Sequence, residues 1–142
     1  VKRRSKSQKR SNSDEAYIID LCDEVLGCVA SRQHKFDFLK GDAGTKLPVD
    51  AYYQELSLVI EYREKQHSEE VKFFDRKKTV SGVSRGEQRR LYDQRRRNVL
   101  PKHGIHLIEL DYSEFSHSSS KRLLRDKEND IIVIRNKLQA YI

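Results

Sequence analysis

An α/β domain is the fold class that the sequence predicts, because helical and strand patterns alternate along its 142 residues. The helical patterns repeat apolar residues every three or four positions. The strand patterns are short runs rich in Val, Ile, Leu, Tyr and Phe, separated by polar or Gly-containing turns. In order, the expected elements are a helix at 14–27, strands at 30–39, 47–53 and 57–63, a basic helix at 85–100, a strand at 105–110 and C-terminal helical segments.

The first helix and the first strand have clear boundaries in the sequence. Ser13 or Asn12 can cap the helix, since their side-chain oxygen atoms accept hydrogen bonds from the first turn. Gly27 is a natural end for it, because glycine adopts the left-handed conformation that closes many helices. In the strand at 30–39, aromatic residues alternate with polar ones, and we expect it to pair with the strand at 47–53.

The second and third strands are expected to form a tight hairpin that places two acids opposite each other. If Tyr53 pairs with Leu58, the same register pairs Asp50 with Glu61. Like charges in that position destabilise a sheet, so the arrangement needs a reason. A divalent cation supplies one, because magnesium is commonly held by one or two carboxylates together with water.

The helix at 85–100 is unusually basic, with Leu91, Val99 and Leu100 as its expected apolar contacts. Such a charge run can be a solvated face or a surface for phosphate groups, because guanidinium groups bind phosphate with two hydrogen bonds. Basic residues also follow the hairpin and can grip a nucleic acid or simply face solvent. The residues proposed for nucleic-acid binding are Arg89, Arg90, Arg95, Arg96, Lys77 and Lys78.

The C-terminal part begins with a predicted helix break at 101–104, where a proline precedes a glycine by three residues. The strand at 105–110 should run parallel to a neighbour, because a helix separates it from the hairpin. The last helix, expected at 126–142, carries apolar residues that could cover the sheet or form a dimer contact. The sequence does not choose between these two roles.

Composition limits the class of protein. Apolar and charged residues each make up 36% of the chain, so any core is small. Six of the seven net positive charges lie in residues 1–12, which we expect to be a disordered basic arm, and residues 13–142 then form one nearly neutral domain. No apolar run approaches the roughly 20 residues that span a bilayer.

Two further features bear on where the protein acts. Cys22 and Cys28 lack the Cys/His spacing of a zinc site and are expected to be reduced, which favours the cytoplasm. The N-terminus has no apolar signal segment. Since the chain begins at Val1 and contains no Met, we expect its natural start to lie upstream.

The hairpin and its flanks resemble a known family. Pro48-Val49-Asp50, a hairpin and then Glu61-Tyr62-Arg63 resemble the motif of the PD-(D/E)xK nucleases, and Gln66-His67 is similar to the pair that follows in their very short patch repair-type (Vsr-like) branch. The resemblance implies a restriction-endonuclease-like fold with a three-layer core, in which a mixed four-stranded sheet lies between helices. It covers residues 13–112 as an order of elements, but its specific part is only Asp50 to His67.

The resemblance also implies roles for individual residues. Asp50 and Glu61 would bind Mg²⁺ or Mn²⁺, which polarises the scissile phosphate and activates water. Arg63 stands where the family usually has Lys; it cannot act as a base, but it could orient water or stabilise negative charge. His67 would transfer a proton or position water, and Gln66 would hold a phosphate or a ligand of the metal.

Two more positions follow the family pattern. Small relatives often carry a Glu early in the first helix near the metal, and Glu15 stands there, although an acid in a first turn is also favoured by the helix dipole. Arg32-Gln33 stands where the family often has an Arg-Gln pair, without a role that the sequence assigns.

The resulting functional hypothesis is a metal-dependent endonuclease that hydrolyses phosphodiester bonds in DNA, of a repair, recombination or mobile-element type, with a homodimer as one expected form. One alternative is a catalytically inactive nuclease-fold domain that binds DNA or RNA, which the replacement of Lys by Arg63 favours. The other is a protein-interaction module that uses the C-terminal helix. No membrane association is expected.

Overall fold

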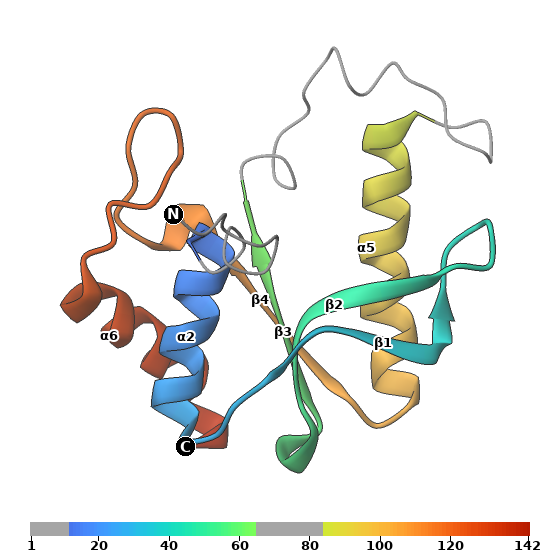
Figure 1. The fold of residues 1–142 in the computed structure, drawn as a ribbon, viewed down its shortest axis with the longest axis horizontal. Coiled ribbons are helices and arrows are strands. Elements are labelled where there is room, and N and C mark those ends of the chain that lie inside the picture. Colours follow the sequence, from blue (N-terminus) through green and yellow to red (C-terminus); the bar gives the residue numbers. More distant parts are fainter. Residues whose placement is uncertain (1–11, 65–83) are drawn as a thin grey trace, which may run out of the picture.

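The computed structural model describes residues 12–64 and 84–142, which form three layers with a four-stranded sheet in the middle. Helices α2 and α6 cover one face of the sheet and α5 covers the other (Figure 1). The main elements are α2 (Asp14–Leu26), β1 (Ser31–Lys40), β2 (Lys46–Tyr53), β3 (Leu58–Arg63), α5 (Arg85–Lys102), β4 (His106–Asp111) and α6 (Lys127–Lys137). The predicted α/β class, with a mixed sheet between helices, is therefore confirmed.

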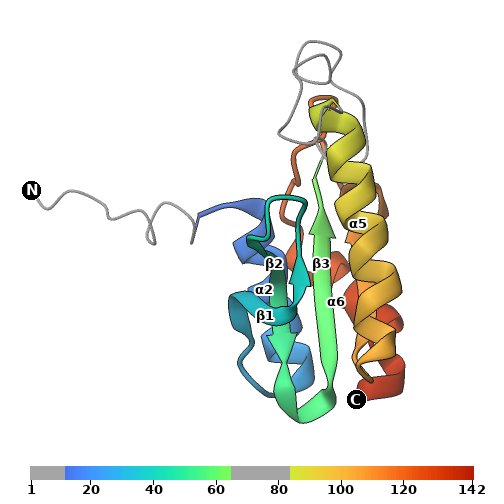
Figure 2. The same ribbon diagram turned by 90° about the vertical axis from the view of Figure 1, so that its right-hand side faces the viewer.

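The strands lie in the order β1-β2-β3-β4, which is also their order in the sequence. β1 pairs with β2 and β2 with β3 in antiparallel fashion, whereas β3 and β4 are parallel. The parallel pair was predicted from the intervening helix, α5, which runs back along the sheet in the direction opposite to β3 (Figures 1 and 2). Such a crossover places the carboxyl ends of β3 and β4 at the same edge of the sheet.

Both ends of α2 follow the sequence prediction. The Ser13 side chain accepts a hydrogen bond from the Ala16 amide at 3.0 Å and caps the first turn. Gly27 ends the helix in the left-handed region, with φ of 72°. This fixed start matters for the site, because Asp14 and Glu15 lie in the first turn.

The predicted break at 101–104 comes two residues too early, since α5 continues through Pro101 to Lys102. Proline removes one backbone donor, here the one that would bond to the Arg97 carbonyl oxygen, and only Lys102 follows it in the helix. The His103 amide bonds to the Leu100 carbonyl oxygen at 3.0 Å and closes the helix instead.

The last helix is shorter than predicted, because α6 ends at Lys137 and a 3₁₀ turn follows at Gln139–Tyr141. Ile134 and Leu138 are fully buried in the main core. Of the two roles left open for this segment, covering the fold is thus the one observed. In residues 12–64 and 84–142, no helix has the length and apolar character needed to span a membrane.

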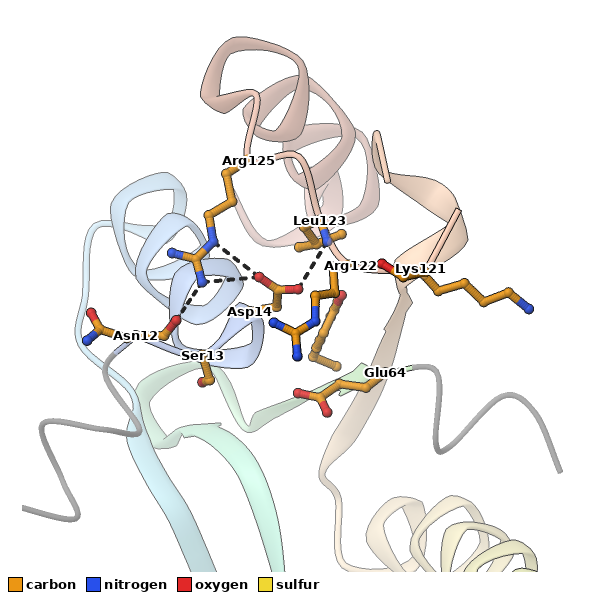
Figure 3. Close-up of a pocket in the computed structure, with 10 residues that line it drawn as sticks. Asn12, Ser13, Asp14, Glu64, Lys121, Arg122, Leu123 and Arg125 are labelled. Atoms are coloured by element: carbon orange, nitrogen blue, oxygen red, sulfur yellow. Dashed lines mark hydrogen bonds and ion pairs between the residues drawn. The ribbon is translucent and has the colours of Figure 1, made fainter. Parts of the chain in front are cut away.

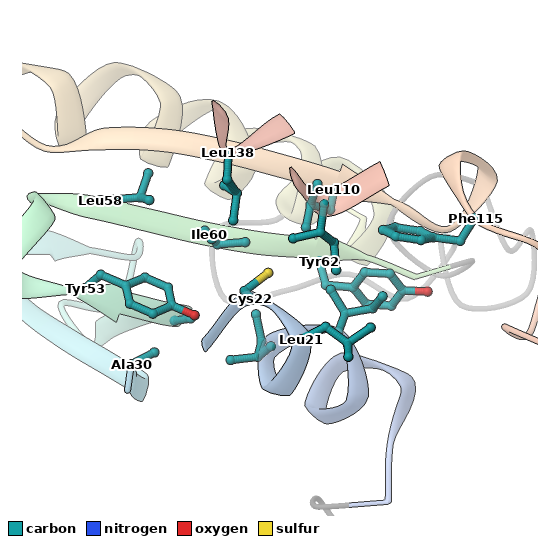
Figure 4. Packing of buried hydrophobic residues seen from close by; sticks show 14 of the residues in the cluster. Leu21, Cys22, Ala30, Tyr53, Leu58, Ile60, Tyr62, Leu110, Phe115 and Leu138 are labelled. Atoms are coloured by element: carbon teal, nitrogen blue, oxygen red, sulfur yellow. The ribbon is translucent and has the colours of Figure 1, made fainter. Parts of the chain in front are cut away.

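Two apolar clusters hold the layers together, one on each face of the sheet. The larger cluster joins α2, α6 and the strands, and Figure 4 shows Cys22 of α2 directed toward Ile60 and Leu138. The smaller one lies under α5 and contains Phe36, Leu39, Leu47, Val49, Val59, Leu100 and Ile105. Their burial provides the main driving force for folding, and it also positions the polar groups described next.

Candidate active site

The hairpin between β2 and β3 brings Asp50 and Glu61 together. Its register pairs Tyr53 with Leu58 and Ala51 with Ile60, as predicted, so the two acids stand opposite each other. The Asp50 amide donates to Glu61 Oε2 at 2.7 Å, and the Tyr62 amide donates to Asp50 Oδ2 at 2.8 Å. Each carboxylate is therefore held by a backbone amide of the hairpin.

Gln33 of β1 and Glu15 of α2 complete this group of polar side chains. Gln33 Nε2 lies 3.0 Å from Glu15 Oε2 and 3.5 Å from Asp50 Oδ1, so one amide contacts two acids. Gln33 has φ of 50°, an unusual backbone conformation for a residue other than glycine. Such a conformation costs free energy and persists only where the surrounding structure holds it. Residues of this kind are often found at functional sites.

The electrostatics of the group favour uptake of a cation or of protons. Burial raises the pKa of Glu61 well above its usual value, and the nearby charge of Asp50 raises it further. Burial, followed by the charge of Asp50, raises the pKa of Glu15 to about 8. The same two causes raise the pKa of Glu64, at the end of β3. Four acids from three elements thus share one region of negative potential.

The donor set of Asp50 and Glu61 is suited to a hard divalent cation. Among residues 12–64 and 84–142, no group of three or more His, Cys, Asp or Glu side chains is arranged to hold a metal ion. Magnesium often uses only one or two carboxylates and completes its shell with water. Each carboxylate oxygen also keeps a second lone pair beyond its present hydrogen bond. By its chemistry, the pair therefore fits Mg²⁺ or Mn²⁺.

Arg63 is part of a buried ion-pair network rather than of this acid group. Its Nη1 lies 2.6 Å from Asp93 Oδ1 and its Nη2 lies 2.7 Å from Glu109 Oε1. The residue is 7% exposed, and its Nε has no hydrogen-bond partner within residues 12–64 and 84–142. The role in orienting water or stabilising charge stays a prediction, and these contacts weigh against it because both Nη atoms are already paired.

Arg96 instead reaches the candidate site from α5. Its Nε lies 3.2 Å from Glu61 Oε1, and its Nη2 donates to the Pro48 carbonyl oxygen at 3.0 Å. Its Nη1 also pairs with Asp93 at 3.1 Å. The positive charge lowers the pKa of Glu61, against the effect of burial. Arg96 therefore compensates the charge of one acid of the group, Glu61. Its predicted contact with nucleic acid stays a prediction.

The other predicted binding residues fall into three groups. Arg95 Nη1 donates to the Lys40 carbonyl oxygen at 2.8 Å and its Nη2 pairs with Asp42 at 3.1 Å, so it joins α5 to the turn after β1. Arg89 is half-buried and Arg90 exposed on the first half of α5. Lys77 and Lys78 lie outside the described residues, as do Gln66 and His67, which were predicted to act in catalysis.

A cavity of about 640 Å³ lies beside the acid group. Two residues that line the cavity, Tyr62 and Glu64, also contact the acid group. The Tyr62 amide donates to Asp50, and Glu64 interacts electrostatically with Asp50. The cavity walls come from the start of α2, the end of β3 and the loop before α6. Asp50 and Glu61 do not line it. Sequence reasoning missed this cavity because its walls are far apart in the chain.

Comparison of the chain with models of protein families, with curated proteins and with solved structures gave no match.

Proposed function

We propose that this protein is a metal-dependent endonuclease that hydrolyses phosphodiester bonds in nucleic acid, with DNA as the expected substrate. The observation that carries the proposal is the pair of opposed carboxylates of Asp50 and Glu61, each held by a backbone amide across the hairpin. Such a pair is unfavourable in a sheet unless positive charge compensates it, and Arg96 pairs with Glu61 alone of the two acids. The PD-(D/E)xK-like motif around it supports the same chemistry, and reduced Cys22 and Cys28 agree with a cytoplasmic setting.

In this proposal Asp50 and Glu61 hold Mg²⁺ or Mn²⁺. When bound, such an ion neutralises charge on a phosphate and lowers the pKa of water. The amides of Asp50 and Tyr62 fix the two carboxylates before any ligand arrives, so little reorganisation is needed.

Gln33 and Glu15 have supporting roles. Gln33 Nε2 contacts both Asp50 and Glu15 and so fixes the distance between them. Without a bound cation, burial and the charge of Asp50 raise the pKa of the Glu15 carboxyl to about 8. A cation at Asp50 would lower this pKa, so Glu15 would release its proton as the ion binds.

A second candidate function is nucleic-acid binding without cleavage. Two contacts favour it: Arg63, in the usual Lys position of the motif, is held in buried ion pairs, and Arg96 already pairs with Glu61. The basic face of α5 would then supply the affinity, which should fall steeply with salt.

Cleavage assays with the full chain separate these functions. Labelled duplex, single-stranded, branched and mismatched DNA, together with RNA, are incubated with Mg²⁺ or Mn²⁺ and with Asp50→Asn and Glu61→Gln variants. We expect each variant to lose more than about 100-fold in cleavage rate, since losing even supporting groups of a metal site costs 10- to 100-fold. The control is Glu128→Gln, an exposed acid on α6 that should cleave like the wild type.

The outcomes discriminate clearly. Salt-dependent binding without metal-dependent cleavage supports the second candidate and contradicts the first. Cleavage that survives Asp50→Asn contradicts the proposed site. The oligomeric state, measured by light scattering with and without duplex DNA, tests the expected homodimer.

A further inference from the structure

The cavity beside the acid group has a mixed but mainly basic wall (Figure 3). Three basic residues line it, Lys121, Arg122 and Arg125, against two acidic residues, Asp14 and Glu64. Asp14 is neutralised locally, because Arg125 Nε donates to its Oδ1 at 3.1 Å. The charges of Asp14 and Arg125 therefore offset each other, and Arg122 is the cation of the wall that acts on Glu64.

The loop that carries Arg122 is firmly fixed to the fold. The Ser118 amide donates to the Arg122 carbonyl oxygen at 2.8 Å, and the next residue, Leu123, donates its amide to Asp14 Oδ2 at 3.0 Å. Lys121 and Arg125, on either side, have φ of 66° and 58°, which side chains rarely adopt. Strained backbone held in this way is common where a loop clamps a ligand.

The Arg122 guanidinium differs from that of Arg125, which is held by two partners. Arg125 Nη2 donates to the Asn12 carbonyl oxygen at 2.6 Å, in addition to its pair with Asp14. Arg122 is exposed, and among the residues that the structure describes its guanidinium makes no hydrogen bond or ion pair, although its charge lowers the pKa of Glu64. Figure 3 shows Arg122 and Glu64 directed into the same space.

We propose that Arg122 binds a backbone phosphate of the nucleic acid, adjacent to the phosphate that is cleaved. This inference rests on the proposed function and names a substrate contact that the nuclease motif does not include. A guanidinium presents five N–H donors, so it can bind phosphate bidentately and still face Glu64. The Ser120 hydroxyl, also in the cavity wall, can donate a further hydrogen bond.

The position of Glu64 connects this phosphate site to the bond-breaking site. Glu64 lines the cavity and also interacts electrostatically with Asp50 and Glu15. A strand whose scissile phosphate lies at Asp50 and Glu61 would therefore pass over the cavity with its next phosphate near Arg122. Arg122 is thus a positioning residue for the substrate, and we expect it to affect KM more than kcat.

The first test uses inorganic phosphate and does not depend on cleavage. Backbone amide spectra of the full chain are recorded during a phosphate titration, for the wild type, Arg122→Ala, Arg122→Lys and the control Arg135→Ala, an exposed arginine on α6. We expect the amide signals of Ser120, Arg122 and Leu123 to shift in the wild type and the control. The shifts should be weaker in Arg122→Lys and should disappear in Arg122→Ala. Absent shifts, or equal shifts in Arg122→Ala, overturn the phosphate site.

The second test uses an oligonucleotide substrate. With metal removed by chelation, Arg122→Ala should weaken binding several-fold and reduce the salt dependence by about one phosphate contact, whereas Arg135→Ala should not. With metal present, Arg122→Ala should raise KM and leave kcat nearly unchanged. If the chain cleaves nucleic acid and both variants behave alike, this inference fails and the proposed function stands. If phosphate binds but nucleic acid is neither bound nor cleaved, the proposed function fails, and so does the proposal that Arg122 binds the phosphate of a nucleic acid.

Discussion

The two faces of the sheet are built from different kinds of interaction. The face under α2 and α6 is almost entirely apolar, with Asp130 as its buried acid, hydrogen-bonded to Tyr17. The face under α5 has a smaller apolar cluster and buries Glu61, Arg63 and Asp93. The difference indicates a division of roles: one face supplies most of the driving force for folding, and the other fixes charges close to the candidate site.

The charges under α5 form a continuous chain of ion pairs. Arg96 pairs with both Glu61 and Asp93, and Asp93 also pairs with Arg63. Glu109 of β4 then receives Arg63 at 2.7 Å and Arg97 at 2.7 Å. Buried ion pairs contribute little net stability, but the loss of one partner leaves an uncompensated charge. Removing one charged partner here should therefore lower the free energy of unfolding by leaving a buried charge uncompensated, whereas truncations on the apolar face lower it by creating a cavity.

The largest effect is expected for Asp93→Ala. It leaves the buried Arg63 without one of its two partners and also removes a partner of Arg96. We expect the free energy of unfolding to fall by about 3–5 kcal/mol, as for other broken buried pairs. Urea unfolding followed by circular dichroism measures it. Gln94→Ala, the exposed next residue on α5, serves as the control and should change stability by less than about 0.5 kcal/mol.

A double substitution sharpens this prediction. In Arg63→Met with Asp93→Leu, both charges are replaced by apolar groups, while Glu109 keeps Arg97 and Arg96 keeps Glu61. The double variant should be more stable than Asp93→Ala alone, because it removes the buried Arg63 charge together with its partner, whereas Asp93→Ala leaves that charge buried with one partner fewer. A double variant less stable than the single one would contradict the proposed origin of the effect.

On the apolar face, Leu138→Ala should reduce the free energy of unfolding by about 2–4 kcal/mol. Leu138 is fully buried in the main cluster, so its truncation leaves a cavity there. The same urea experiment tests this. Ile132→Ala, on α6 but 57% exposed, is the control and should lose much less. Equal losses in the two variants would mean that α6 is not docked as described.

Local patterns predict the hairpin well and the orientation of α5 poorly. Side chains alternate along strands, and a tight turn fixes the register, so Asp50 and Glu61 could be paired from the sequence alone. On α5, Leu91 was expected to make apolar contacts, yet it is 44% exposed, while Asp93 is buried. The helix turns Asp93 inward to meet Arg63 of β3, and such a tertiary contact has no local sequence signal.

The site residues divide in the same way. The roles of Gln33 and Arg96 depend on contacts between elements that are distant in the sequence, namely β1 with α2 and α5 with β3. The cavity likewise combines residues near 13, 63 and 122. Local patterns in the sequence do not indicate these contacts between distant residues, because the contacts form only when the layers pack together.

The smallest of these effects, and the one that depends on pH, concerns Glu15, where the acid group meets α2. Its pKa in the folded protein is raised from 4.5 to about 8, so the folded state binds a proton that the unfolded state has already released. The stability that this proton provides is complete below about pH 4.5 and is lost as the pH rises toward 8 and above. Glu15→Gln keeps the acceptor for Gln33 and removes the charge, so near pH 9 it should be about 1–2 kcal/mol more stable than the wild type.

Thermal unfolding of both proteins from pH 4 to 9, in chelator, measures the difference, which should vanish at the acid end. A constant difference across that range would contradict the raised pKa. If Mg²⁺ stabilises the wild type more than Glu15→Gln near pH 9, the acid group responds to a cation as the proposed site requires.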